Sequence, residues 1–291
     1  MISISKKIKY LISLYWPSKK FTQDPFSENI VDERYIPIPL NGWKLIPWVA
    51  KDLVLRRISI ALSFSKNKLL AVIIPVRDRD DHLSILIPRL RRILDAQQIC
   101  YKIFVIEQSK GSAFNKGALI NTGFKIIGKN FDYICLHDAD AIPVQANYHC
   151  PSVPLRLVHS LIDSVNGDRR DKRYFGGVIC LKIEHFSLAN GFSNNYWGWG
   201  KEDDDFLFRL WFSGLTCYFD SMGCFEDLKN PEGQGFESTK YSGRKNYRRN
   251  RSTRSRMIRG IDNFLMQGLN TVNYPYKAVN YDLAIRYLVY I

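Results

Sequence analysis

Four acidic residues follow one another at positions 202–205, directly after the stretch WGWGK at 197–201. The pattern from Glu202 to Phe212 predicts a short helix with Glu202 and Asp203 in its first turn. The positive end of a helix dipole stabilises carboxylates there and offsets their mutual repulsion. An ionised carboxylate in a site can act as a general base toward a hydroxyl. The alternative is a capped helix whose tryptophans lie in the core.

Trp197 and Trp199 alternate with Gly198 and Gly200. This spacing indicates a flexible loop that carries a flat aromatic surface. Aromatic faces pack against the C–H faces of sugar rings. Beside the acids, the loop therefore favours a sugar hydroxyl as the group to be deprotonated.

A second acidic pair, Asp138 and Asp140, ends the apolar run FDYICLHDAD at 131–140. In extended backbone, residues two apart project to the same side. Two converging carboxylates need a cation, and a hard divalent ion with oxygen ligands that also binds a diphosphate suits them. A turn without a metal is the alternative for so short a motif.

Basic residues follow the first strongly apolar run, LLAVIIPV at 69–76. Arg77 and Arg79 come after Pro75, and arginine binds phosphate well because its planar fork reaches two oxygens. The alternative is a surface loop whose arginines pair with the neighbouring aspartates.

The elements that must position these groups alternate between strand and helix. Strands are predicted at 69–76, 101–108, 131–140, 176–183 and 215–220, and helices at 80–97 and 114–128. This order indicates an α/β fold with a mixed, mostly parallel sheet flanked by helices. In such sheets ligands gather at the carboxyl ends of the strands, where both Asp138 and Arg77 lie.

The chain has 291 residues and a formal charge of +14, which favours anionic partners without choosing among them. Its six cysteines form no C-x-x-C pair and no dense disulfide pattern, so a reducing compartment is favoured. The basic run at 240–259 is poor in aliphatic residues, and we expect a solvated or mobile loop there.

The N-terminal residues show no signal peptide, and no apolar run is long enough to span a membrane. Apolar residues between Ile4 and Tyr15 have helical spacing, with lysines between them. Such a basic amphipathic helix either lies on an anionic membrane or packs on the protein's own core. We expect a cytoplasmic protein, with peripheral contact to the inner face of the membrane if the first alternative holds.

Six segments, taken in order, resemble the β-1,4-galactosyltransferases, the inverting glycosyltransferase family 7. The resemblance runs from about Leu70 to Tyr274, and details such as HDAD, Lys201 and GLNTV are most similar to the xylosyl-protein galactosyltransferase branch. The segments are AVIIPVRDR (71–79), FNKGALINTGF (114–124), DYICLHDADAIP (132–143), YFGGV (174–178), NGFSNNYWGWGKEDDDF (190–206) and GLNTVNY (268–274).

The resemblance implies a GT-A-like nucleotide-sugar-binding fold, UDP-galactose as donor and Mn²⁺ or Mg²⁺ as cofactor. It implies donor-binding roles for Pro75, Arg77, Arg79, Phe114, Lys116, Asp138, Tyr174 and Trp199. Tyr174 matches the position that restricts the donor to galactose. Trp199, Gly200, Glu202 and Asp203 would bind the acceptor, with Asp203 as the catalytic base beside Glu202.

The metal site is where the chain departs from the family. Asp140 would be a direct ligand, but the segment CFEDLKNP at 224–231 contains no histidine where the family has its histidine ligands. The best overlay puts Asp227 and Lys229 at those positions. An aspartate can bind Mn²⁺ or Mg²⁺, whereas a protonated lysine cannot. Cys135 and Cys150 lie near positions that are disulfide-bonded in some relatives, but their spacing differs.

The sequence therefore predicts an N-terminal extension at 1–66, a catalytic domain at 67–280 and a C-terminal tail at 281–291. The predicted activity moves galactose to a sugar hydroxyl of a glycan or lipid-linked acceptor in β-1,4 linkage. One alternative is a transferase of the same fold that uses UDP-GalNAc or UDP-glucose. The other is a non-catalytic nucleic-acid binder, which the charge allows but which leaves the acidic row unexplained and shows no known binding module. We therefore expect no nucleic-acid partner.

Overall fold

The computed structural model describes residues 35–37, 64–65, 67–165, 167–171, 175–228, 242–258 and 266–291. The predicted N-terminal helix, Tyr174 and Lys229 lie outside the described residues. No helix within these ranges is long and apolar enough to cross a membrane.

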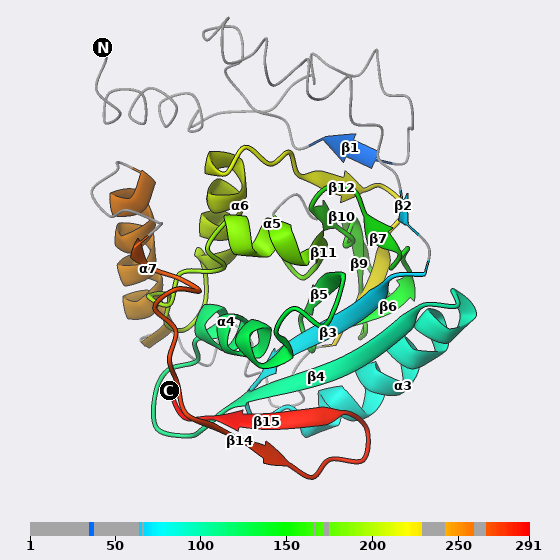
Figure 1. Ribbon diagram of the computed structural model, residues 1–291, viewed down its shortest axis with the longest axis horizontal. Helices are drawn as coiled ribbons and strands as arrows, with labels where there is room; N and C mark the ends of the chain where they lie inside the picture. The colour runs from blue at the N-terminus through cyan, green and yellow to red at the C-terminus, as the bar shows by residue number, and fades with distance from the viewer. Residues whose placement is uncertain are drawn as a thin grey trace, which may run out of the picture.

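Within the described residues, the main sheet has nine strands (Figure 1). Their spatial order is β1 (Tyr35–Pro37), β12 (Tyr218–Asp220), β8 (Leu155–Arg156), β11 (Val178–Lys182), β5 (Tyr133–His137), β3 (Leu69–Val76), β4 (Cys100–Gln108), β15 (Ile285–Val289) and β14 (Tyr276–Val279). Parallel pairing joins β5, β3, β4 and β15, and β12 with β8, while β11, β1 and β14 pair antiparallel to their neighbours. The predicted mixed sheet is confirmed, with its parallel run confined mainly to the centre.

Two smaller sheets extend this frame. One has the order β10 (Arg169–Asp171), β9 (Ser160–Asp163), β13 (Cys224–Asp227) and β6 (Ala141–Gln145). The other pairs β2 (Phe64–Ser65) with β7 (Cys150–Pro151). The first matters for the site, because β6 and β13 are antiparallel neighbours and place Asp227 opposite Ala141.

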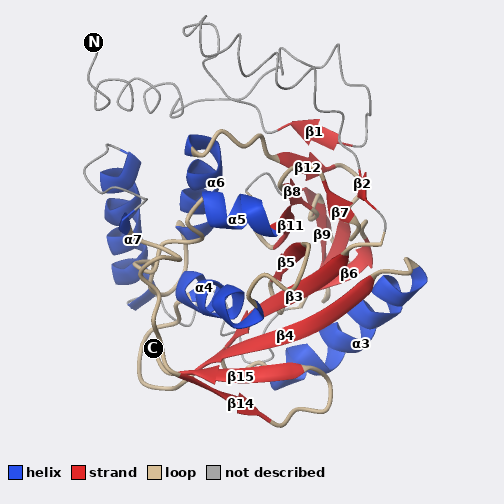
Figure 2. Cartoon of the chain, in the orientation of Figure 1, coloured by secondary structure: helices blue, strands red, loops and turns tan. Residues whose placement is uncertain are grey.

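Helices cover both faces of the main sheet (Figure 2). They are α3 (Asp80–Ala96), α4 (Lys116–Ile127), α5 (Ile183–Leu188) and α6 (Glu202–Phe212), while α7 (Ser242–Ile258) packs against α6. Side chains in β3 alternate between two cores: Leu70, Val72 and Ile74 pack with α3, whereas Ala71 and Ile73 pack with α4, α5 and α6. This period of two follows from the pleat of the strand and fixes the faces on which the helices lie.

The predicted elements at 69–76, 80–97, 101–108, 114–128, 176–183 and 202–212 are all present, with ends shifted by up to two residues. The strands predicted at 131–140 and 215–220 are present but shorter, as β5 and β12. Two other segments differ in kind from expectation. The basic run at 240–259 was expected to be a loop, and this is wrong, because residues 242–258 form α7. Residues 281–291, expected as a tail, contribute β15, which pairs parallel with β4.

Candidate active site

The site forms where β3 and β5 end. These strands are parallel neighbours, so the residues that follow them lie at one edge of the sheet. Arg77 and Arg79 follow β3, and Asp138 and Asp140 follow β5. A strand was predicted as far as residue 140, but the chain turns at residues 139–140. The backbone N–H of Asp138 donates to the carbonyl of Gly177 on the β11 side at 2.9 Å, which fixes where the turn begins.

Lys116 connects the two acidic motifs. It is the first residue of α4, whose N-cap Asn115 accepts a hydrogen bond from the N–H of Ala118 at 2.9 Å. The Lys116 ammonium lies 2.8 Å from a carboxylate oxygen of Asp138 and 3.1 Å from one of Asp203. These carboxylates raise the pKa of Lys116 against the opposing effect of burial, so the lysine stays charged between them.

Each acid of the row 202–205 lies in a different environment, because successive helical residues point about 100° apart. Asp203 pairs with Lys116, and Asp204 lies 2.9 Å from the ammonium of Lys201. Asp205 is buried, and its carboxylate lies 2.6 Å from Nε of Arg209. Separate cations therefore offset the repulsion at Asp203, Asp204 and Asp205, in addition to the helix dipole. Lys201 begins the helix with φ +80° and without a side-chain cap.

Burial raises the pKa values of both Glu202 and Asp203. Burial raises the pKa of Asp203 to about 8, with Glu202 and Asp138 adding to the rise and Lys116 opposing it. Burial also raises the pKa of Glu202. Its Oε2 is buried and has no hydrogen-bond partner among the described residues. A buried carboxylate oxygen without a donor is costly, so a ligand hydroxyl would satisfy it.

Asp140 lies directly before β6, and Asp227 ends the paired strand β13. The N–H of Leu228 donates to the carbonyl of Asp140 at 2.9 Å, which holds the start of β6 against the end of β13. Asp140 is exposed at the surface of the site, although protein groups lie around its carboxylate. Desolvation, Asp138 and Asp227 together raise its pKa to about 6, while Arg79 opposes the rise. The site thus holds more negative charge than its cations offset.

This donor set suits a hard divalent cation, since both side chains offer carboxylate oxygens. No group of three or more His, Cys, Asp or Glu residues is arranged to hold a metal within the part of the chain that the structure describes. Asp140 and Asp227 are the predicted ligands, and further ligands would have to come from water or a diphosphate.

Of the remaining residues predicted to bind the donor, some lie at the site and one is buried in a strand. Arg77 donates to the carbonyl of Ser112 at 2.6 Å, and its guanidinium lies 5.8 Å from the centre of the Phe114 ring. Arg79 is near Asp140 and lies 3.2 Å from His82. Pro75, in contrast, is buried within β3. The structure brings together the two arginines, Phe114, Lys116 and both acidic motifs, whereas Pro75 is buried in β3 and its donor-binding role stays a prediction.

The loop at 197–201 is held by α7. Trp199 has 61% of its surface exposed, so it is no core residue, and it stacks on Tyr247 with ring centres 5.9 Å apart. The buried Asn250 donates to the carbonyls of Gly200 at 2.9 Å and Trp197 at 3.1 Å. Gly198 and Gly200 have φ of +70° and +100°, which glycine adopts without strain. Tyr247 and Asn250 were missed because the segment was interpreted as a loop.

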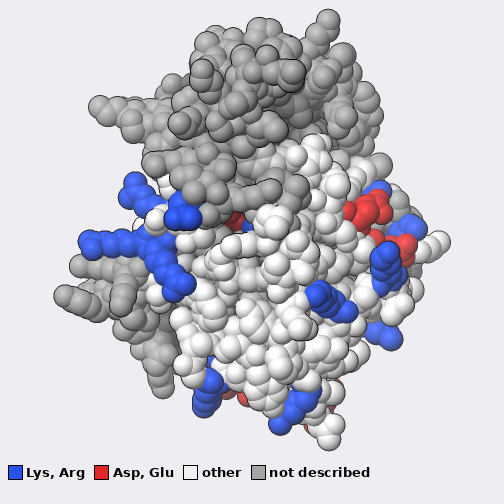
Figure 3. Space-filling model, turned by 60° about the vertical axis from the view of Figure 1, so that its left-hand side comes forward, with Lys and Arg blue, Asp and Glu red and all other residues white. Residues whose placement is uncertain are grey.

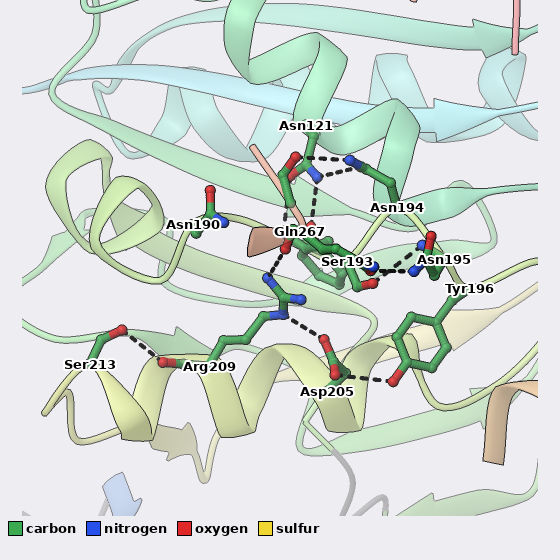
Figure 4. A network of polar contacts seen from close by, with 12 residues as sticks. Asn121, Asn190, Ser193, Asn194, Asn195, Tyr196, Asp205, Arg209, Ser213 and Gln267 are labelled. Carbon is green, nitrogen blue, oxygen red and sulfur yellow. Dashed lines mark hydrogen bonds and ion pairs between the residues drawn. The ribbon is translucent and has the colours of Figure 1, made fainter. Parts of the chain in front are cut away.

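A buried polar network joins the acidic helix to α4 (Figure 4). Asp205 accepts from the hydroxyl of Tyr196 at 3.0 Å, and Arg209 donates to the carbonyl of Gln267 at 2.7 Å. Asn194 bonds both Asn121 of α4 at 2.8 Å and the carbonyl of Gly268 at 2.8 Å. The segments 190–196 and 267–271 thus join α4 to α6 and fix Lys116 relative to Asp203.

The cysteines give no sign of a disulfide among the described residues. Cys135 and Cys150 are both free and buried. Cys135 lies opposite Cys180 in the pairing of β5 with β11, and Cys180 is fully buried. Cys150 lies in the separate strand β7.

Comparison with known proteins identifies the family. Residues 63–151 match the model described as the N-terminal region of glycosyl transferase group 7, and residues 156–230 match the N-terminal domain of galactosyltransferase. Together these matches cover more than half of the chain. The chain is 43% identical over 150 residues to beta-1,4-galactosyltransferase 1 of Bos taurus, and 36% identical over 149 residues to beta-1,4-galactosyltransferase 7 of Homo sapiens. These alignments span 50% and 51% of the chain, but only 37% and 46% of the relatives' lengths.

The fold agrees with this identification. The catalytic domain of Drosophila beta1,4galactosyltransferase 7, solved with xylobiose, superposes with a TM-score of 0.59 at 27% identity. The match covers 77% of this chain and 93% of the Drosophila chain. A mutant of that Drosophila protein in complex with manganese, UDP-Gal and xylobiose superposes with a TM-score of 0.58 at 28% identity. The fold is thus the GT-A-like fold expected from the sequence, and the chain belongs to glycosyltransferase family 7, the family of the β-1,4-galactosyltransferases.

Proposed function

We propose that this protein transfers galactose from UDP-galactose to a sugar hydroxyl of a glycan or lipid-linked acceptor, with inversion and in β-1,4 linkage. Family membership and the Drosophila relative solved with UDP-Gal support the donor and the reaction class. The observation that carries the proposal is the arrangement at the start of α6. There Asp203 has a raised pKa and contacts Lys116, beside a buried Glu202 oxygen that has no partner among the described residues.

Asp203 is the proposed base. A carboxylate whose pKa lies near the working pH accepts a proton from a hydroxyl effectively and releases it afterwards. The acceptor oxygen then forms a bond to the anomeric carbon from the face opposite the diphosphate. The bond between that carbon and the diphosphate oxygen breaks, and the electron pair leaves with UDP. Glu202 accepts a hydrogen bond from the acceptor and orients it.

Positive side chains serve the donor. Arg77 and Phe114 are proposed to hold the uridine end, and Arg79 and Lys116 the diphosphate, because cations placed where negative charge develops lower the barrier. Lys116 also keeps Asp138 and Asp203 at a fixed separation. Trp199 offers its exposed face to the donor and acceptor sugar rings.

The proposed cofactor is Mn²⁺ or Mg²⁺. Asp140 and Asp227 would hold it, and when bound it would offset negative charge on the departing diphosphate. Manganese is present in the structure of the Drosophila relative. Lys229, aligned with a family histidine, lies outside the described residues, and its role stays a prediction.

Donor and acceptor choice stay predictions as well. Tyr174, expected to favour galactose over its N-acetylated form, lies outside the described residues. The Drosophila relative binds xylobiose, which makes xylosides the first acceptors to test here. Curated relatives include galactosyltransferases 1, 4 and 7, so glucosides and N-acetylglucosaminides belong in the same panel.

The test is UDP release from UDP-galactose with Mn²⁺ and each acceptor, with the anomeric configuration of the product read by NMR. Acceptor-dependent release that gives a β-linked galactoside supports the proposal. Faster release with UDP-GalNAc or UDP-glucose would favour the alternative donor. Binding of none of the UDP-sugars would overturn the proposal.

A further inference from the structure

Helix α7 has two chemically different faces. Its sequence, SGRKNYRRNRSTRSRMI, contains no acidic residue. Across the described side chains at 246–257, the residues that face the protein are Asn246, Tyr247, Asn250, Arg254 and Met257. Their spacing of three and four residues makes one helical stripe. The remaining positions, including Arg248, Arg249 and Arg251, are on the outer side.

The inner stripe is occupied by contacts with the site. Asn250 holds the backbone of the 197–200 loop, and Tyr247 stacks on Trp199. Arg254 lies 3.8 Å from Asp204 and 5.2 Å from the centre of the Phe208 ring. These contacts fix α7 beside the acceptor loop, so its outer side has a defined direction relative to the site.

The outer side offers exposed positive charge. Arg248, Arg249 and Arg251 are exposed, and no carboxylate of the described residues forms an ion pair with them. Figure 3 turns the α7 side of Figure 1 forward and shows Lys and Arg side chains grouped there with few acidic ones. We call Arg248, Arg249 and Arg251 the arginine face.

We propose that the arginine face docks the enzyme on an anionic lipid bilayer. Lys and Arg residues next to such a surface are attracted by its negative potential. The described outer positions carry no large apolar side chain, so the helix would lie on the headgroups and not insert. They also carry no aromatic ring on which bases could stack, because Tyr247 is turned inward against Trp199, and this argues against single-stranded nucleic acid.

Docking would set the acceptor class. The inner stripe of α7 holds the loop that carries Trp199 and leads into Glu202 and Asp203. A bilayer against the outer side therefore lies one helix away from the acceptor loop, within reach of a saccharide attached to a lipid. The docking itself is independent of the chemistry, whereas this consequence for the acceptor rests on the proposed galactosyl transfer.

The test is flotation of the full chain with vesicles of phosphatidylcholine, alone or mixed with phosphatidylglycerol, at low and high salt. We expect binding only to the anionic vesicles and only at low salt. The triple variant R248E/R249E/R251E should bind at least about a hundred-fold more weakly, since losing each basic residue near the surface costs roughly five-fold and each glutamate is repelled in addition. Because the three substituted positions are exposed, this variant should keep the fold, and a thermal melt checks this.

Two further variants separate the alternatives. R89E/R92E/K102E makes the same change of net charge at exposed positions on α3 and β4 and should keep most of the binding. R248K/R249K/R251K should bind like the wild type, because a lipid surface responds to charge, whereas a built phosphate site needs the arginine fork. Undiminished binding of R248E/R249E/R251E would overturn the proposal and assign membrane contact to another segment. Tight binding of duplex DNA without binding to anionic vesicles would overturn it too.

The vesicle assay needs neither donor nor acceptor. A protein that docks but transfers nothing would leave this inference standing and refute the proposed function. Transfer to soluble xylosides with no vesicle binding would do the reverse.

Discussion

Asn250 lies on α7, outside the acidic helix, yet the structure gives it a direct influence on acceptor use. Its buried amide donates to the carbonyls of Gly200 and Trp197 at 2.9 and 3.1 Å. Asn250→Ala removes both bonds, together with the longer ones to the carbonyl of Trp199 at 3.4 Å and from the N–H of Trp197 at 3.3 Å, while keeping a good helix former in α7. A hydrogen bond of this kind contributes about 1 kcal/mol, so the loop conformation should lose roughly 2 kcal/mol, or about thirty-fold in population.

The assay is acceptor-dependent UDP release by Asn250→Ala beside Ser252→Ala, an exposed position on the same helix. We expect kcat/KM for the acceptor to fall by about thirty-fold in the first variant and to stay unchanged in the second. Binding of UDP-galactose, measured by calorimetry, should weaken less than acceptor use, because Arg77 and Arg79 are positioned by β3 and not by the loop that Asn250 holds. Wild-type kcat/KM in a folded Asn250→Ala variant would refute the reasoning that α7 holds the loop.

Three further predictions concern the carboxylates. Burial raises the pKa of Asp203 to about 8, and a base must be deprotonated, so the acceptor-dependent rate should rise with pH through about 8; a pH–rate profile that is flat from 6 to 9 would contradict this. Asp205→Asn leaves the buried Arg209 without its counter-ion and should lower the free energy of unfolding by roughly 3–5 kcal/mol, which urea denaturation measures. Asp227→Asn should raise the Mn²⁺ concentration needed for half-maximal activity without altering the thermal melt, and an unchanged Mn²⁺ dependence would exclude Asp227 as a ligand, leaving Asp140 as the other candidate.

Much of the frame could be predicted from local pattern. The β-branched run of β3, the helical spacing of α3 and the acidic start of α6 each follow from residue type and period, and the structure places them within two residues of expectation. Because ligands in α/β sheets bind at the carboxyl ends of the strands, Asp138 and Arg77 were predicted to lie at one edge of the sheet, and they do.

What local pattern could not show is pairing over long distance. Lys116 lies 22 residues before Asp138 and 87 before Asp203, and only the packing of α4 against the 190–196 segment brings the three together. Strand β15 was missed for the same reason, because its parallel partner β4 lies far away in the sequence.

The misinterpretation of α7 has a different cause. The density of positive charge favoured a loop, whereas Asn246, Asn250 and Met257 recur at the helical intervals of four and seven residues. An arginine-rich segment with one regular polar stripe can fold against a partner surface, and here that surface is the acceptor loop.

The most direct test of the central claim compares Asp203→Asn with Asp204→Asn. Both substitutions remove one charge from the first turn of α6, but only Asp203 contacts Lys116, whereas Asp204 contacts Lys201. We expect Asp203→Asn to lose about 10²–10⁴-fold in acceptor-dependent UDP release while still binding UDP-galactose, and Asp204→Asn to stay near the wild type. Equal loss in both variants, or activity retained by Asp203→Asn, would contradict the assignment of Asp203 as the base.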